Sequence, residues 1–190
     1  MVGLPDPEFS LLDEELIHSG YAFELLSTTW VDSSGKRFER DIVRHRGAVA
    51  VVPITNDGRH VLLVRQFRTA INDWLLELPA GLRDKDGESE VETALRELEE
   101  EVGCVPGSIE HLATLVTAVG FTDESIAIYL ASDLTWTQRL ADGVEEESMT
   151  VETVPLSEID KMIEVGHITD AKTVAGLLLA RDRIADVHGS

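Results

Sequence analysis

Residues 95–104 read LRELEEEVGC and gather four carboxylates around one guanidinium. The acidic side chains are those of Glu97, Glu99, Glu100 and Glu101, and the basic one is that of Arg96. Like charges one helical turn apart destabilise an exposed helix by roughly a few tenths of a kcal/mol, and by more where packing excludes water. A bound cation would reverse that effect, and carboxylate oxygens are the ligands that Mg²⁺ and Mn²⁺ prefer. The segment is therefore a candidate site for a divalent metal ion.

The residues on either side predict the helix that holds these carboxylates. Ser89 is a favourable N-cap, Glu92 stands where its capping-box partner belongs, and Gly103 is placed to end the helix. Apolar residues recur between them at helical spacing, so they form one stripe that must face a core. The members of this stripe are Val91, Ala94, Leu95, Leu98 and Val102.

The carboxylates occupy a flank of that stripe. At about 100° per residue, Glu90, Glu97 and Glu101 fall together, with Glu100 adjoining, whereas Arg96 is expected toward the other edge. The alternative is an ordinary solvated acidic helix, in which Arg96 forms i,i+4 ion pairs with Glu92 and Glu100.

Composition limits the class of protein. The chain has 190 residues with 43% hydrophobic content, which fits one domain with a core and a small extra element. Its 16 basic and 36 acidic residues give a formal charge of -20, which disfavours nonspecific binding to nucleic acid or to an anionic membrane. No apolar run is long enough to cross a bilayer, the first residues do not resemble a signal peptide, and Cys104 is the single cysteine. We therefore expect a cytoplasmic protein in which Cys104 is a small buried apolar residue.

The remaining elements indicate an α+β fold. Residues 21–45 alternate around a turn and predict a β-hairpin, and the apolar runs at 47–54 and 61–67 predict two strands that pair with each other. Further strands are expected near 74–79, 111–119, 125–131 and 149–156, and helices over 156–166 and 170–185. The order strands, helix, strands, helices predicts a mixed α/β/α sandwich. We expect residues 1–45 to form an N-terminal β extension and residues 46–190 the main domain.

From residue 81 to residue 104 the chain reads GLRDKDGESEVETALRELEEEVGC, which resembles the signature of the Nudix hydrolases. The matching positions are Gly81, Glu88, Arg96, Glu97, Leu98, Glu100, Glu101 and Gly103. The loop between Gly81 and Glu88 is one residue longer than is usual in that family, and Cys104 replaces an aliphatic residue. The stretches RQFR, WLLELPAG, GFTDE and GHITDAKTVAGLLLA are similar to the ADP-ribose pyrophosphatase branch. Val119 stands where that branch usually has proline before the glycine of GFTDE.

The resemblance implies the Nudix sandwich and metal-dependent hydrolysis of the pyrophosphate bond in a nucleoside diphosphate linked to a sugar, first of all ADP-ribose to AMP and ribose 5-phosphate. The alternative substrate is another nucleotide sugar, such as GDP-mannose or UDP-glucose, because Val119 departs from the proline of that branch. Two other classes are an isomerase with the Nudix fold and a non-catalytic binding or sensor domain. The intact Arg-Glu and Glu-Glu pairs favour a hydrolase.

The resemblance also implies roles for individual residues. Glu97, Glu101 and the backbone carbonyl of Ala80 would bind Mg²⁺ or Mn²⁺, Glu100 would be a further ligand or would support one, and Arg96 would orient the glutamates. A glutamate from a later loop would join the metals or activate water, and the candidates there are Glu145, Glu146 and Glu147.

Substrate contacts are expected outside the acidic helix. Arg65 and Arg68 would bind phosphate or form ion pairs, Trp74 would stack on a base or join the core, and Glu124 would contact substrate or metal. A two-stranded ribbon is marginal alone, and in related enzymes the N-terminal strands help to form a dimer, so a homodimer is expected.

Overall fold

The computed structural model describes residues 8–139 and 148–188 and divides the chain into two compact units. The N-terminal unit contains residues 1–47 and 116–125, and the core unit contains residues 48–115 and 126–190. The segment 116–125 belongs to the N-terminal unit although it lies far from it in the sequence.

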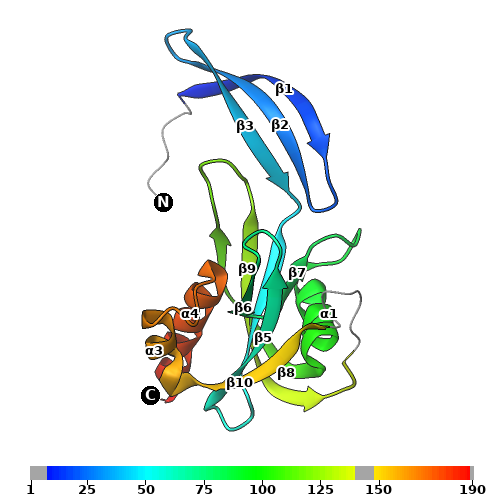
Figure 1. Cartoon of the computed structure of the whole chain (residues 1–190), viewed down its shortest axis with the longest axis vertical. Coiled ribbons are helices and arrows are strands. Elements are labelled where there is room, and N and C mark those ends of the chain that lie inside the picture. The colour runs from blue at the N-terminus through cyan, green and yellow to red at the C-terminus, as the bar shows by residue number, and fades with distance from the viewer. Residues whose placement is uncertain (1–7, 140–147, 189–190) are drawn as a thin grey trace. The chain divides into compact units, whose positions relative to one another are not determined.

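The N-terminal unit is built on an antiparallel sheet of β1 (Phe9–Ser19), β2 (Phe23–Asp32) and β3 (Arg37–His45), in that order (Figure 1). The hairpin predicted over 21–45 is present as β2 and β3. Its turn is stabilised by Asp32, whose carboxylate accepts hydrogen bonds from the backbone N–H groups of Ser34 and Lys36, both at 2.9 Å. Strand β1 was not predicted, because two register irregularities break its alternation.

The segment 116–125 is joined to β3 by backbone hydrogen bonds. The N–H of Val43 donates to the carbonyl of Phe121 at 2.7 Å, and the N–H of Asp123 donates to the carbonyl of Val43 at 3.3 Å. The Asp123 carboxylate then accepts from the N–H of His45 at 2.8 Å. The end of β3 and the GFTDE segment therefore form one piece of structure.

The core unit contains two sheets. One has the order β10 (Thr150–Pro155), β5 (His60–Arg68), β6 (Asp73–Glu77), and the other has the order β7 (Ala80–Leu82), β4 (Ala48–Pro53), β9 (Ser125–Trp136), β8 (Cys104–Val116). Strands β4 and β9 are parallel, whereas β4 and β7 are antiparallel, so this sheet is mixed. The prediction that the strands at 47–54 and 61–67 pair with each other is wrong, because β4 and β5 lie in different sheets and share one isolated bridge between Ile54 and Val61.

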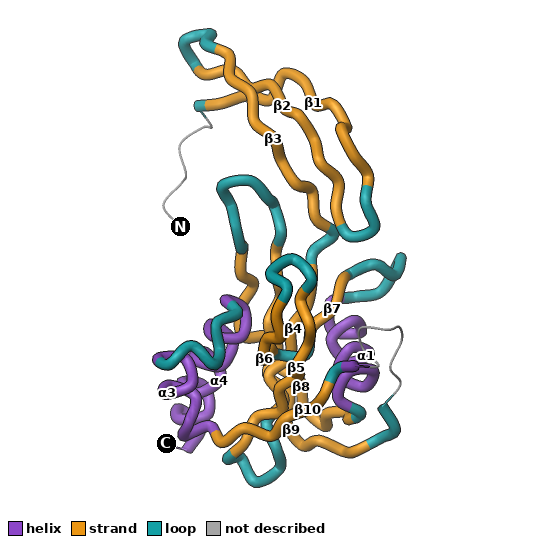
Figure 2. The backbone as a smooth tube through the Cα atoms, in the orientation of Figure 1, coloured by secondary structure: helices purple, strands orange, loops and turns teal. Residues whose placement is uncertain are grey.

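Helices cover the strands from two sides, as Figures 1 and 2 show. Helix α1 (Glu90–Val102) lies on one side, and α3 (Ile159–Glu164) and α4 (Ala171–His188) lie on the other, after the short 3₁₀ helix η1 (Leu156–Glu158). Strand β4 is apolar on both faces because alternate residues point to the two cores: Val51 packs with Leu98 of α1, and Val52 packs with Leu177 of α4. The predicted α+β sandwich is confirmed.

Two smaller observations complete the fold. Cys104 is buried in the core next to α1, and burial raises the pKa of its thiol to about 11, which suits a small apolar residue. No helix among residues 8–139 and 148–188 combines the length and the apolar composition needed to cross a membrane.

Candidate active site

Helix α1 begins and ends where local sequence signals place it. The Ser89 hydroxyl accepts a hydrogen bond from the N–H of Glu92 at 3.3 Å, and the Glu92 carboxylate accepts one from the N–H of Ser89 at 2.8 Å. Gly103 ends the helix with φ 77°, a left-handed conformation that glycine adopts at little cost. The predicted capping box and C-terminal glycine are both confirmed.

The buried face of α1 carries acidic side chains as well as apolar ones. Ala94, Leu98 and Val102 are buried as predicted, whereas Val91 is exposed. Glu97 and Glu101 are also buried, with 7% and 4% of their surface exposed. Because an ionised carboxylate is costly to bury without a charged or hydrogen-bonding partner, these two residues indicate a built site rather than a solvated acidic helix face.

Arg96 holds several of these carboxylates together. Its Nη1 donates to Glu97 at 2.6 Å and to Glu100 at 2.8 Å, and its Nε donates to Glu88 at 3.1 Å. Burial opposes its charge, but these carboxylates raise the pKa of the Arg96 guanidinium well above its ordinary value. The expectation that Arg96 lies toward the other edge of the helix is therefore wrong. Helical angle places the Cα atom, and the long arginine side chain reaches back to its acidic neighbours.

The backbone of β7 lies directly against the two buried carboxylates. The N–H of Ala80 donates to Oε2 of Glu101 at 2.9 Å. At Gly81, an added Cβ atom would lie 2.0 Å from both Cδ and Oε1 of Glu97. Gly81 therefore leaves the space that the Glu97 carboxylate occupies, and the hydrogen bond from Ala80 holds the Glu101 carboxylate against β7.

The side chains gathered here suit a hard divalent cation. Carboxylate and backbone carbonyl oxygens are the donors that Mg²⁺ and Mn²⁺ prefer, and Gly81 lets the Glu97 carboxylate lie directly against the backbone of β7. Within the described ranges no three acidic, histidine or cysteine side chains already converge as metal ligands. Arg96 instead donates hydrogen bonds to oxygens of both Glu97 and Glu100.

The model of the NUDIX domain matches residues 44–177, which include the acidic helix, β7 and the strands around them. The chain belongs to the Nudix family. It is 36% identical over 166 residues to an ADP-ribose pyrophosphatase of Bacillus subtilis, covering 87% of this chain and 89% of the relative.

Two further relatives widen the comparison. A GDP-mannose pyrophosphatase of Cronobacter sakazakii is 31% identical over 176 residues, covering 86% of this chain and 90% of the relative. The crystal structure of an ADP compounds hydrolase superposes with a TM-score of 0.83 at 27% identity, covering 98% of this chain and 99% of the other. The predicted membership of the Nudix hydrolases, close to the ADP-ribose pyrophosphatases, is therefore confirmed.

The two arginines proposed for this Nudix chain lie on β5 and have different surroundings. Arg65 pairs with Glu152 of β10, with Nε 2.5 Å from Oε1, and both side chains are more than one-third exposed. Arg68 binds Glu77 through Nε and Nη2, both at 2.7 Å, and this carboxylate is almost fully buried. Trp74 lies on β6, stays 44% exposed and packs edge to face against Phe67 at 5.6 Å, so it is not a core residue.

The other proposed site residues are Glu124 and a run of three glutamates near residue 146. Glu124 belongs to the N-terminal unit, where its carboxylate accepts from the Thr117 hydroxyl at 2.6 Å and lies 3.6 Å from the His45 ring. Glu145, Glu146 and Glu147 lie outside the described residues.

Sequence reasoning missed Glu77 and Lys172, which meet in the core unit. Their side chains form an ion pair although 95 positions separate them in the chain. The signal that could have found Glu77 is an acidic residue inside the apolar run WLLELPAG, because a charge in a buried strand requires a partner. Nothing local indicates that the partner is Lys172.

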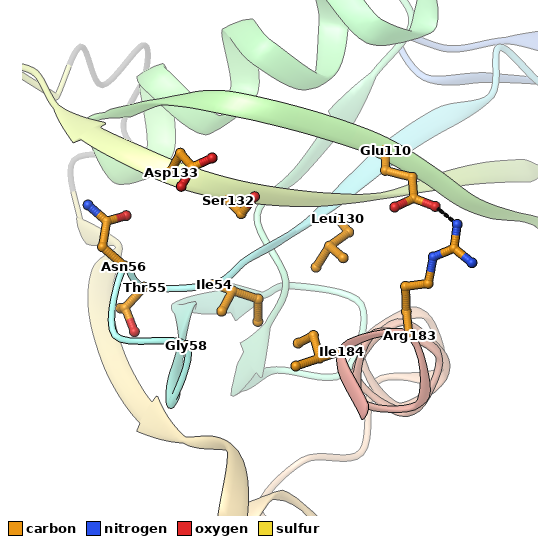
Figure 3. A pocket seen from close by; sticks show the side chains of 10 residues that line it. All are labelled: Ile54, Thr55, Asn56, Gly58, Glu110, Leu130, Ser132, Asp133, Arg183 and Ile184. Carbon is orange, nitrogen blue, oxygen red and sulfur yellow. Dashed lines mark hydrogen bonds and ion pairs between the residues drawn. The ribbon is translucent and has the colours of Figure 1, made fainter. Parts of the chain in front are cut away.

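A separate cavity of about 290 Å³ lies in the core unit and contains none of the proposed site residues. Ile54, Leu130 and Ile184 supply its apolar wall, and Figure 3 shows the Glu110 carboxylate paired with Arg183 of α4 at its edge. Because that arginine is already paired with a carboxylate, the cavity offers little attraction to a phosphate group.

Proposed function

We propose that this chain hydrolyses the pyrophosphate bond of ADP-ribose, giving AMP and ribose 5-phosphate, in a reaction that requires Mg²⁺ or Mn²⁺. The observation that carries the proposal is the pair of buried carboxylates, Glu97 and Glu101, held against the backbone of Ala80 and Gly81. The ADP-ribose pyrophosphatase of Bacillus subtilis, similar over most of its length, supports the choice of substrate.

Glu97, Glu101 and the carbonyl of Ala80 would hold the metal ion, and Glu100 would supply or support a further oxygen. When bound, such an ion neutralises charge on the phosphoryl oxygens and lowers the pKa of a water ligand. Arg96 keeps Glu97 and Glu100 oriented through hydrogen bonds of 2.6 and 2.8 Å. Without the Arg96 charge, the neighbouring carboxylates would repel one another. The role of Arg96 is therefore to position these carboxylates.

Side chains outside the acidic helix would contact the substrate. Arg68 presents a guanidinium to the phosphates, and the exposed ring of Trp74 offers a surface on which a base could stack. We keep Arg65 and Glu124 as further substrate contacts. One of the three glutamates Glu145, Glu146 and Glu147 would activate the attacking water.

A different nucleotide sugar is the second candidate. Val119 precedes the GFTDE segment, is 69% exposed and replaces a proline, so the segment keeps a backbone N–H and more freedom in φ. That N–H donates to the carbonyl of Thr117 at 3.1 Å. The similarity to a GDP-mannose pyrophosphatase also favours this alternative. A binding domain without catalysis would have no chemical need for the buried acidic pair.

We also propose that two copies of the chain associate through the N-terminal unit. Strand β1 is exposed along its whole length and carries large apolar side chains, and an exposed apolar surface of this kind is typical of an interface. These side chains are Phe9, Leu11, Leu12, Leu16 and Ile17.

A panel of ADP-ribose, GDP-mannose and UDP-glucose, assayed with Mg²⁺ and with Mn²⁺ and read out by product identity, tests the function. Wild type should prefer ADP-ribose, and Glu97→Gln or Glu101→Gln should lower turnover by about 10² or more, because each removes a charged ligand. Mg²⁺ should raise the Tm of wild type more than that of either variant. Wild-type turnover in both variants would reject the metal assignment.

The choice of substrate is tested by the effect of Val119→Pro and by the preference of wild type between ADP-ribose and GDP-mannose. Val119→Pro should change kcat/KM for ADP-ribose by less than about threefold, because hydrogen bonds to β3 already hold the GFTDE segment. If wild type favours GDP-mannose over ADP-ribose by tenfold, about 1.4 kcal/mol of transition-state stabilisation, the second candidate replaces the first.

A further inference from the structure

Glu77, at the end of β6, is a buried carboxylate held between two cations. Only 1% of its surface is exposed. Arg68 donates to both of its oxygens, from Nε to Oε1 and from Nη2 to Oε2, each at 2.7 Å. The Lys172 ammonium, from α4, binds the same Oε2. Burial alone would raise the pKa of the Glu77 carboxyl, but these two cations hold it below its ordinary value.

The first turn of α4 fixes this group from the other side. Asp170 accepts from the Lys172 ammonium at 3.0 Å, and its Oδ2 also accepts from the N–H and the hydroxyl of Thr173, at 2.9 and 2.6 Å. The buried Thr173 hydroxyl accepts in turn from the N–H of Leu78 at 2.9 Å. The residue that follows Glu77 is therefore bonded to the same helical turn that supplies Lys172.

Stability is a weak explanation for such a cluster. Replacing a buried ion pair by apolar residues of similar volume is often neutral or stabilising, because both charges must be desolvated. The cluster does have one consequence for Arg68 that apolar residues could not provide. Glu77 binds the Nε and Nη2 edge of the guanidinium, so the plane of the guanidinium is fixed.

The other edge of Arg68 is free for a ligand. Its Nη1 makes no hydrogen bond to any residue that the structure describes, and the side chain is 39% exposed. Strand β5 contacts α1. The hydrogen bonds that Arg68 donates to Glu77 are the main cause that raises the pKa of Arg68, and the charge of Glu101 on α1 adds to them. The free Nη1 and Nη2 edge can bind two oxygens of a phosphate at once.

We propose that Glu77 is a positioning residue: with Lys172 and Asp170 behind it, it holds Arg68 so that the free guanidinium edge meets a phosphoryl group of the substrate next to the acidic helix. This inference rests on the proposed pyrophosphatase function. An arginine side chain that is already fixed loses less rotamer freedom when it binds a phosphate than a freely rotating one does. Arg65 lacks this arrangement, because its carboxylate partner Glu152 is itself more than one-third exposed.

The test is a double-mutant cycle in the full chain, with kcat/KM for ADP-ribose and Mg²⁺ as readout. Glu77→Gln should lower kcat/KM at least tenfold, and Arg68→Met at least as much. The double variant should match Arg68→Met within twofold, because Glu77 acts through Arg68. The Mg²⁺ concentration for half-maximal activity should stay unchanged in Glu77→Gln. Asp160→Asn, which removes the 2.6 Å pair with Arg181 between α3 and α4, is the matched control and should keep wild-type activity.

The results of this cycle distinguish a failure of the positioning role of Glu77 from a failure of the proposed function. If Glu77→Gln lowers kcat/KM by the same factor with and without Arg68, its role is structural and the inference is rejected; near wild-type activity of Glu77→Gln rejects it as well. If wild type hydrolyses no nucleotide sugar, the proposed function has failed instead. Should Glu77→Gln not fold, the cycle is run with Lys172→Met added to every variant, which removes the second cation that Glu77 neutralises.

Discussion

Gly81→Ala should separate the acidic site from the stability of the fold. The new Cβ would lie 2.0 Å from Cδ and Oε1 of Glu97, and ordinary contact begins at 3.4 Å, so the carboxylate must move by about 1.4 Å. The end of a glutamate side chain can swing away, so the backbone is able to stay in place. Its carboxylate, however, would leave the position where β7, Arg96 and Glu101 meet.

The size of the effect follows from that displacement. A misplacement of about 1 Å at a reacting centre lowers rates by up to about 10²-fold, which corresponds to roughly 2.7 kcal/mol. We expect kcat/KM for ADP-ribose to fall by about that factor and the Mg²⁺-dependent rise in Tm to shrink. The Tm without metal should change little, because the residue is only partly buried and its φ is one that alanine adopts.

Gly58→Ala is the control for the glycine substitution itself. Gly58 has φ +68° in the turn between β4 and β5, and an added Cβ would meet nothing within 4 Å. Alanine there should destabilise the fold by roughly 1–2 kcal/mol through its backbone conformation while leaving kcat/KM unchanged. If Gly81→Ala shows wild-type kcat/KM and a wild-type response to Mg²⁺, Glu97 does not need its observed position and the reasoning is refuted.

Three further outcomes are expected. In Glu77→Gln, the loss of unfolding free energy relative to wild type should be about 3–5 kcal/mol near neutral pH. Cations hold the pKa of Glu77 in the folded state below its ordinary value of 4.5. The stability difference between wild type and variant, measured by chemical denaturation, should therefore be complete above pH 4.5 and disappear as pH falls through the folded pKa. A stability difference that does not change with pH would contradict this prediction. Ser89→Ala should destabilise the fold by about 1 kcal/mol, measured as a shift in the urea midpoint, because Glu92 loses its cap; an unchanged midpoint would show that the cap adds nothing. Light scattering at micromolar concentration should give the mass of two chains, and a monomer would count against association through β1.

Local chemistry explains which parts of this fold are predictable from the sequence. Helix α1 was placed correctly at both ends, because Ser89, Glu92 and Gly103 act on backbone groups within one turn of themselves. The hairpin of β2 and β3 was found for the same reason, since Asp32 organises the turn between them. Strand β1 was missed because its irregular register hides the alternation that identifies a strand.

Which strands pair with each other was harder to predict from the sequence. The apolar runs of β4 and β5 are adjacent in the sequence and suit each other, yet β4 pairs with β7 and β9, and β5 pairs with β6 and β10. Both runs are apolar on two faces, so their residue types fit any buried neighbour equally well. Periodicity therefore identifies a buried strand but does not say which strand it pairs with.

The acidic residues of the site were determined by the sequence, and their arrangement by the tertiary structure. The spacing of Glu97 and Glu101 on one helix already puts both carboxylates on the same flank, because helical geometry is local. The space that Gly81 leaves for Glu97, the reach of Arg96 to Glu88 and the meeting of Glu77 with Lys172 depend on how β7, α1 and α4 pack. Charged side chains are long and flexible, so only the folded chain decides which partners come within hydrogen-bonding distance.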